Sequence, residues 1–150
     1  MITAKDIMTR QVITVSPETS IEELAKILIE NRISGAPVVD KEGNLIGIVT
    51  ENDLINQNKR LHIPTVIRLF DAMIMLERPK KIEEEIKRLT ATKVWDICTK
   101  QVITINEDTS LQDIATIMSE KKVHLLPVMR DNKLVGIIGK ADLIKAMAGS

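Results

Sequence analysis

The stretch that decides the fold is Gly-Ile-Val-Thr-Glu-Asn-Asp-Leu-Ile, at residues Gly47–Ile55. The apolar, β-branched-rich run Leu45–Val49 predicts a buried strand, and the residues after Thr50 predict a helix that follows it directly. A helix N-terminus leaves backbone N–H groups free and carries a partial positive charge, so this junction is a candidate anion site. Asp53 lies in the first helical turn, where its carboxylate can hold sugar hydroxyls.

A second, closely similar junction occurs near the end of the chain, at Leu134–Ile144. The similarity extends outward, because Asp6–Val15 is repeated with few changes as Asp96–Ile105. Within the repeats Pro37 matches Pro127, Gly47 matches Gly136 and Asp53 matches Asp142. We therefore predict two copies of one unit, residues 1–57 and 93–148, separated by a segment 58–92 that has no counterpart in either.

Each copy predicts the element order strand, helix, strand, strand, helix. In the first copy the strands are expected at 12–15, 36–39 and 45–49, and the helices at 21–31 and from 51 onward. Ser20 and Glu23 form a capping box before the first helix, and residues 40–44 form a tight turn. A unit this small exposes one apolar face, which a second copy would bury. The expected fold is α+β, with two α/β-type β-α-β-β-α repeats packed as a pseudo-two-fold pair.

The segment between the copies predicts a helical insert rather than a loose linker. Pro64 can open a helix whose apolar residues recur at helical spacing over Ile63–Leu76, and Pro79 ends it. Lys80–Leu89 then predicts a mostly charged second helix, in which the acidic run at 83–85 is a solvated face.

Composition excludes several classes of function. The formal net charge is +0, so nothing favours general binding to nucleic acid or to an anionic membrane. Aromatic residues make up 1% of the chain, so a bound base must lie mostly between aliphatic side chains. The single cysteine, Cys98, excludes an internal disulfide and a multi-cysteine zinc site. Without a membrane-length apolar run or a signal-peptide core, the expected location is cytoplasmic.

With both copies in view, the chain resembles the cystathionine β-synthase (CBS) domain family. The signature elements are Asp6–Thr9, Val12–Val15, Ala36–Asp40 and Gly47–Leu54, together with their counterparts in the second copy. The chain looks like a stand-alone tandem CBS pair, often called a Bateman module. The resemblance implies two clefts between the repeats that bind AMP, ADP, ATP or S-adenosylmethionine. It also implies a homodimer assembled through helices.

The resemblance further implies a role for individual residues. In the family the aspartate of the Gly47–Asp53 motif holds ribose hydroxyls, and the preceding Thr or Ser bonds ribose or phosphate. The adenine usually lies against the first strand and the apolar-Pro-Val element. Carried over, the first site would use Thr50, Asp53, Ile13, Thr14, Ala36 and Pro37. The second would use Asp142, Ile103, Thr104, Leu126 and Pro127.

The second copy departs from the family pattern at Gly139, and it differs from the first copy at two further positions. Gly139 stands where Thr50 stands, which removes a hydroxyl, and the ammonium of the following Lys140 can compensate on a phosphate. His124 lies where some family members place a phosphate-binding basic residue, and the first copy has Ser34 there. The two sites are therefore expected to be chemically unequal.

Plain structural explanations remain open for the same residues. Thr50 and Asp53 have the spacing of a capping box, so they can serve the helix alone. His124 and Lys140 can be ordinary surface residues. Cys98 matches Met8 of the other copy, which favours a small buried apolar residue over a nucleophile.

The leading hypothesis is a regulatory module that senses an adenine nucleotide or S-adenosylmethionine and acts on a separate effector protein or on its own assembly. The alternative is a ligand-free scaffold for dimerisation or protein interaction. An enzyme is disfavoured, because the sequence has no phosphate-binding glycine loop, no metal-ligand cluster and no nucleophile–base pair. No catalytic cofactor is expected.

Overall fold

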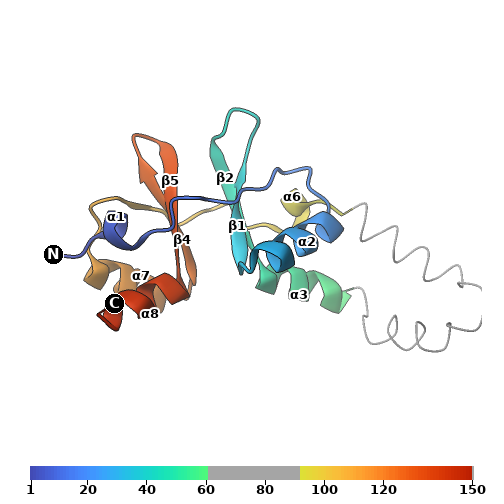
Figure 1. The fold of residues 1–150 in the computed structure, drawn as a ribbon. Helices are drawn as coiled ribbons and strands as arrows, with labels where there is room; N and C mark the ends of the chain where they lie inside the picture. Colours follow the sequence, from blue (N-terminus) through green and yellow to red (C-terminus); the bar gives the residue numbers. More distant parts are fainter. Residues whose placement is uncertain (61–91, 150) are drawn as a thin grey trace, which may run out of the picture.

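The computed structural model describes residues 1–60 and 92–149, which form two similar α+β halves side by side (Figure 1). The predicted fold class and repeat architecture are confirmed. The insert helices expected at Ile63–Leu76 and Lys80–Leu89 lie outside the described residues. The elements are α1 (Ala4–Ile7), α2 (Ile21–Asn31), β1 (Gly35–Val39), β2 (Leu45–Thr50), α3 (Glu51–Arg60), α6 (Val94–Ile97), β3 (Ile105–Asn106), α7 (Leu111–Lys121), β4 (Leu125–Arg130), β5 (Lys133–Gly139) and α8 (Lys140–Met147).

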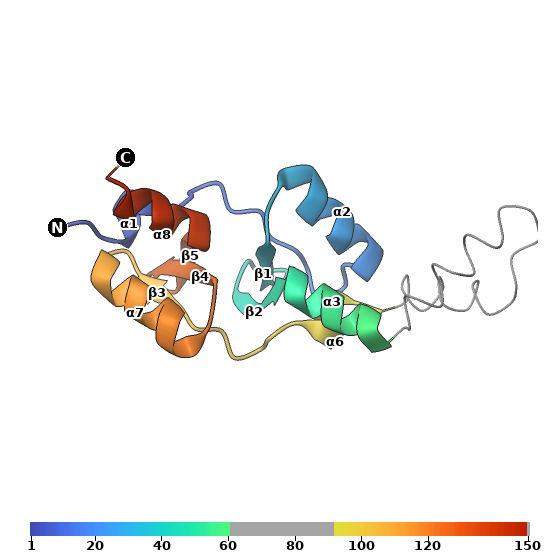
Figure 2. The same cartoon turned by 90° about the horizontal axis from the view of Figure 1, so that it is seen from below.

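The long first helix of each repeat begins and ends in the same way. Ser20 Oγ accepts a hydrogen bond from the backbone N–H of Glu23 at 3.1 Å, as the capping box predicts. Ser110 caps α7 through the N–H of Asp113 at the same distance. The buried faces of α2 and α7 cover the strands of their own half (Figure 2).

The sheets are small antiparallel hairpins. β1 pairs with β2 and β4 pairs with β5, and β3 adds a short parallel strand beside β4. The strand expected at Val12–Val15 is wrong in extent, because it is reduced to a single parallel bridge between Val15 and Val38. The residues before Val15 run between the two halves instead of along a strand.

The short helices α1 and α6, which the sequence analysis did not predict, are exchanged between the repeats. α1 begins the first repeat but packs on the second half, and α6 begins the second repeat but packs on the first half (Figure 1). The amide groups of Ala4 and Lys5 donate to the carbonyls of Thr109 and Glu107, at 2.8 and 3.1 Å. The symmetry-related bonds join Val94 to Thr19 at 2.8 Å and Trp95 to Pro17 at 3.1 Å.

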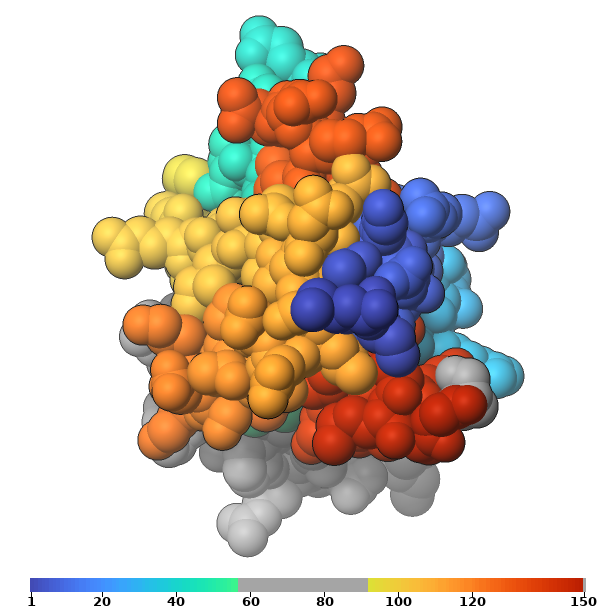
Figure 3. All heavy atoms as spheres, turned by 90° about the vertical axis from the view of Figure 1, so that its left-hand side faces the viewer, coloured from blue at the N-terminus to red at the C-terminus, as the bar shows by residue number. Residues whose placement is uncertain are grey.

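Each core therefore contains side chains from the other repeat. Ala4 and Met8 are buried in the second half among Leu126, Val128 and Ile138. Figure 3 shows this N-terminal segment, in dark blue, lying directly against the atoms of the second repeat. Val94 is fully buried in the first half. The sequence repeats are not independent folding units, because each half needs the leading segment of the other.

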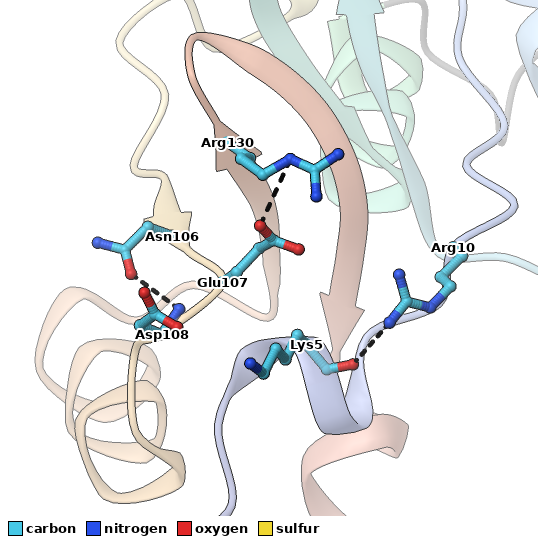
Figure 4. A network of polar contacts seen from close by, with 6 residues as sticks. All are labelled: Lys5, Arg10, Asn106, Glu107, Asp108 and Arg130. Atoms are coloured by element: carbon cyan, nitrogen blue, oxygen red, sulfur yellow. Dashed lines mark hydrogen bonds and ion pairs between the residues drawn. The ribbon is translucent and has the colours of Figure 1, made fainter.

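A polar cluster surrounds the point where α1 meets the second half (Figure 4). Arg130 Nε lies 3.6 Å from Glu107 Oε1, and Arg10 donates to the Lys5 carbonyl at 3.3 Å. The Asp108 amide donates to Asn106 Oδ1 at 3.0 Å, which fixes the turn. An exposed ion pair contributes little to stability, so the exchange depends on the backbone bonds and the buried side chains.

The halves approach each other closely at Gly35, and a methyl group there should destabilise the protein. A Cβ at this position would lie 2.6 Å from the Val49 carbonyl oxygen and 2.9 Å from Leu125 Cδ2 of the other half. We expect Gly35→Ala to cost about 1–3 kcal/mol, which is about 2–4 °C of melting temperature for each kcal/mol at this chain length. The loss of melting temperature can be measured by thermal unfolding, with circular dichroism as the signal.

Gly139→Ala is the matched control, since a Cβ there meets nothing closer than 3.7 Å. An equal loss of melting temperature in both variants would contradict the tight packing around Gly35.

Candidate ligand-binding site

A first pocket, of about 320 Å³, opens beside the junction of β2 and α3. Thr50 and Asp53 line one wall. The opposite wall comes from the segment that connects α6 to β3, including Thr99, Gln101 and Ile103. This Asp53 pocket is thus built from both repeats.

A second pocket, of about 610 Å³, opens beside the junction of β5 and α8. Asp142 and Lys140 line it on one side, and Thr9, Gln11 and Ile13 line it on the other. These last three residues belong to the segment that crosses from α1 to the first half. This Asp142 pocket is the pseudo-two-fold counterpart of the Asp53 pocket.

The two pockets meet at the centre of the pair. Four residues line both of them, namely Ser34, Glu51, His124 and Leu125. A ligand in either pocket would therefore reach the same central region between the halves.

The aspartates cap their helices and still face the pockets. Asp53 Oδ2 accepts from the Thr50 amide at 2.9 Å and lies 3.4 Å from the Thr50 hydroxyl. Asp142 Oδ2 accepts from the Gly139 amide at 2.9 Å, and its Oδ1 lies 3.4 Å from the Thr9 hydroxyl, a long bond across the pocket. Within the described residues, every hydrogen bond of Asp53 uses Oδ2, so Oδ1 is available to a ligand. Capping and ligand binding are compatible.

The helix N-termini offer less to an anion than the sequence suggests. The Glu51 amide donates to the Ser34 carbonyl at 2.8 Å, and the Lys140 amide donates to the His124 carbonyl at 3.1 Å. Together with the amides of Thr50 and Gly139, these are already satisfied within the chain. Two of the amides at each helix start are therefore not free to bind an anion.

Some of the expected site residues do line the two pockets, but two of them line the opposite pocket from the one expected. Ile13 lines the Asp142 pocket and Ile103 lines the Asp53 pocket, which is the reverse of the pairing expected from the sequence. His124 lines both pockets and Lys140 lines the Asp142 pocket. The reason is the crossing of the leading segments, which carries each first-strand residue to the other repeat's aspartate.

Six expected residues do not line either pocket. Ala36, Pro37, Leu126 and Pro127 are fully buried in the strands. Thr14 lines a separate hollow with Asp40, and Thr104 is exposed outside both pockets. Ala36 lies in the core of the first half and Leu126 in the core of the second half.

Sequence reasoning missed three polar pairs that the pockets contain. These are Thr9 with Thr99, Gln11 with Gln101, and Arg32 with Lys122. The sequence does contain a pattern that could have identified them. Each pair has a polar or basic residue at equivalent positions of the two repeats, although core packing does not require one there. Arg32 and Lys122 also adopt the left-handed conformation at φ 54° and 53°, where glycine is usually favoured.

Other chemistry is not supported by the described residues. Burial raises the pKa of the Cys98 thiol, which fits a packing role against Gly47 rather than a nucleophile. No group of acidic, histidine or cysteine side chains in residues 1–60 and 92–149 is arranged to hold a metal ion. Over the same residues, no helix has the length and apolar character needed to cross a membrane.

The fold and the paired pockets define a tandem-repeat domain with one pocket on each side of its pseudo-two-fold axis. The CBS domain model matches residues 4–59 and 94–149. The chain therefore belongs to the CBS domain family and carries two repeats of it.

Several known proteins match this chain over nearly its whole length, which supports the assignment to the family. An uncharacterised protein of Methanocaldococcus jannaschii is 33% identical over 95% of this chain and 89% of its own length. The structure of CBSX2 of Arabidopsis thaliana in complex with AMP matches with a TM-score of 0.74 and 25% identity, over 99% of this chain and 98% of that one. The CBS pair of an M. jannaschii protein in complex with 5′-methylthioadenosine and S-adenosylmethionine matches with a TM-score of 0.72 and 27% identity, over the same shares.

Other curated relatives are longer than this chain. It spans 57% of the chloroplastic CBSX1 protein of Arabidopsis thaliana, with 30% identity over 88% of this chain. The repeat pair therefore also occurs as part of larger proteins.

Because Asp53 caps α3, we expect its substitution to lower the stability of the protein even when no ligand is bound. Asp53→Ala removes the acceptor of the Thr50 amide, so we expect a loss of about 1 kcal/mol and a melting temperature lower by about 2–4 °C. Asp53→Asn keeps an acceptor oxygen and should retain most of the stability. Thermal unfolding of the ligand-free variants measures both. Equal losses in the two variants would contradict a capping role for Asp53.

Proposed function

We propose that the protein is a regulatory module that binds adenosine-containing molecules in its two pockets and is not itself an enzyme. The observation that carries the proposal is the pairing of Asp53 and Asp142 in symmetry-related pockets, each facing a crossing segment from the other repeat. A carboxylate oxygen beside an aliphatic wall suits a ribose and a base, since the carboxylate accepts from hydroxyls and the wall covers an apolar ring face.

The relatives support the ligand class. CBSX2 binds AMP, and the M. jannaschii pair binds 5′-methylthioadenosine and S-adenosylmethionine. Both resemble this chain over nearly its full length. AMP, ADP, ATP and S-adenosylmethionine share the adenosine that these pockets suit.

The pocket geometry also supports a regulatory output. Each pocket has one wall from each half, so a ligand that fits one arrangement of the halves better than another shifts the population toward it. A separate effector protein, or the protein's own assembly, would respond to that shift.

The two aspartates should be needed for binding. We expect calorimetric titration to show saturable binding of at least one of AMP, ADP, ATP and S-adenosylmethionine. Asp53→Ala and Asp142→Ala should each remove binding at one pocket, because each deletes the ribose acceptor. A ligand at a hundred times its dissociation constant should raise the free energy of unfolding by about 2.7 kcal/mol, which thermal shift detects.

Asp96→Ala is the matched control. Asp96 accepts the Lys93 amide at 3.0 Å in the same capping geometry but lines neither pocket. This variant should keep full ligand affinity. No binding of any of the four compounds would contradict the proposal, and equal loss in the Asp96 variant would mean that capping alone explains the effect.

A second candidate function, assembly of a homodimer, is favoured by a separate observation. Large apolar side chains are exposed on three helices, with Ile29 on α2 at 76%, Ile55 on α3 at 62% and Met147 on α8 at 68%. Figure 2 shows these three helices together in one view. Large apolar side chains left exposed on several helices indicate an interaction surface.

Dimer formation through these helices predicts a change in mass. Sedimentation equilibrium should show a dimer for the parent protein and a monomer for the double variant Ile55→Glu, Met147→Glu, because two carboxylates would be buried without partners. Glu30→Gln, an exposed polar change on α2, should leave the dimer intact. A monomeric parent protein would rule out this second function.

A further inference from the structure

The two pockets differ in their charged side chains although they are related by pseudo-symmetry. Lys140 on α8 occupies the position that Glu51 holds on α3. The Asp142 pocket is lined by the cations Arg32 and Lys140 and the anions Glu51 and Asp142. The Asp53 pocket is lined by the cation Lys122 and the anions Glu51 and Asp53. His124 is common to both.

The proposed function assigns the two aspartates to ribose. The sum of the remaining side-chain charges then differs between the two pockets. Arg32 and Lys140 outnumber Glu51 in the Asp142 pocket, which leaves it positive. Lys122 only balances Glu51 in the Asp53 pocket. The backbone does not distinguish the two pockets, since the equivalent amides of both helices donate in the same way, to Ser34, His124 and the aspartates.

The cations of the Asp142 pocket are available to a ligand. The side chains of Arg32 and Lys140 have no hydrogen bond or ion pair with other residues in the described parts of the chain, and both are exposed at the pocket. Arg32 holds the left-handed C-cap of α2 at φ 54°, a position that an arginine occupies at a steric cost and a glycine would occupy freely. An unpaired guanidinium at such a position suits a ligand that brings its own negative charge.

We propose that the two pockets divide adenosine compounds by charge. The Asp142 pocket takes the phosphorylated ones, with Arg32 and Lys140 as the phosphate-binding side chains, and the Asp53 pocket takes those without a phosphate. This inference rests on the proposed function and names the ligand class of each pocket.

The physical basis is the cost of placing a phosphate beside a carboxylate. A phosphate monoester carries about two negative charges at neutral pH and bonds most strongly to guanidinium and ammonium groups. In the Asp142 pocket two cations face it. In the Asp53 pocket it would meet Glu51 with a single lysine to offset the repulsion, whereas an adenosyl compound without a phosphate avoids that repulsion.

The experiment reads each pocket separately by calorimetry. Asp53→Ala leaves the Asp142 pocket, and Asp142→Ala leaves the Asp53 pocket. AMP and 5′-methylthioadenosine are the two probes, because they differ in the phosphate. We expect the Asp142 pocket to bind AMP at least about ten-fold more tightly than methylthioadenosine, as charge-assisted bonds imply. We expect the Asp53 pocket to show no preference for AMP or to prefer methylthioadenosine.

Two further variants test the named side chains in the Asp53→Ala background. Arg32→Gly and Lys140→Ala should each weaken AMP by about ten-fold and change methylthioadenosine by less than about two-fold. Raising the salt concentration should weaken AMP and leave methylthioadenosine unchanged. Arg32→Gly removes a strained side chain, so it should fold at least as well as the parent. Lys133→Ala, an exposed lysine outside both pockets, is the control for general charge.

The outcomes separate the two proposals. Binding of both probes with the same AMP preference in the two pockets overturns the division by charge and leaves the proposed function standing. Equal weakening of both probes by Arg32→Gly or Lys140→Ala overturns their assignment to phosphate. No binding of either probe overturns this inference, and the proposed function falls with it only if ADP, ATP and S-adenosylmethionine also fail to bind.

Discussion

The structure depends on the exchange of two short backbone segments between the repeats. The amides of Ala4 and Lys5 donate to carbonyls of the second repeat, and those of Val94 and Trp95 donate to the equivalent carbonyls of the first. Buried amides and carbonyls must be paired, and here the pairing joins residues that are 75 to 105 positions apart in sequence. The exchange places a segment of each repeat inside the other's core, which holds the halves together.

The same exchange builds the pockets. A segment that leaves α1 for the first half must cross the space between the halves, and Thr9, Gln11 and Ile13 lie on that crossing. The symmetry-related crossing carries Thr99, Gln101 and Ile103. The first crossing segment faces Asp142 at the start of α8, and the second faces Asp53 at the start of α3. Under the proposed function, a ligand bound there would contact the segments that link the halves, so its binding would favour one relative position of the halves.

Much of this could be predicted from the sequence because local patterns determine it. The capping serines, the hairpin turns and the strand–helix junctions at Thr50 and Gly139 are short-range features, and the repeat doubled each signal. The crossing could not be predicted, because two similar repeats offer each leading segment two equivalent partners. That ambiguity explains why the sequence pairs Ile13 with Asp53, whereas Ile13 lines the Asp142 pocket in the structure. Arg32 was missed because a basic residue at a helix C-terminus has an ordinary explanation.

The central claim is that each pocket joins the aspartate of one repeat to the leading segment of the other repeat. A crystal structure of the protein grown with AMP tests it most directly. The account predicts an adenosine whose ribose hydroxyls bond to Asp142 and whose base lies against Ile13, so that two residues far apart in sequence contact one ligand. A ligand that contacts Asp142 without the 9–13 segment, or that binds within a single repeat, would contradict it.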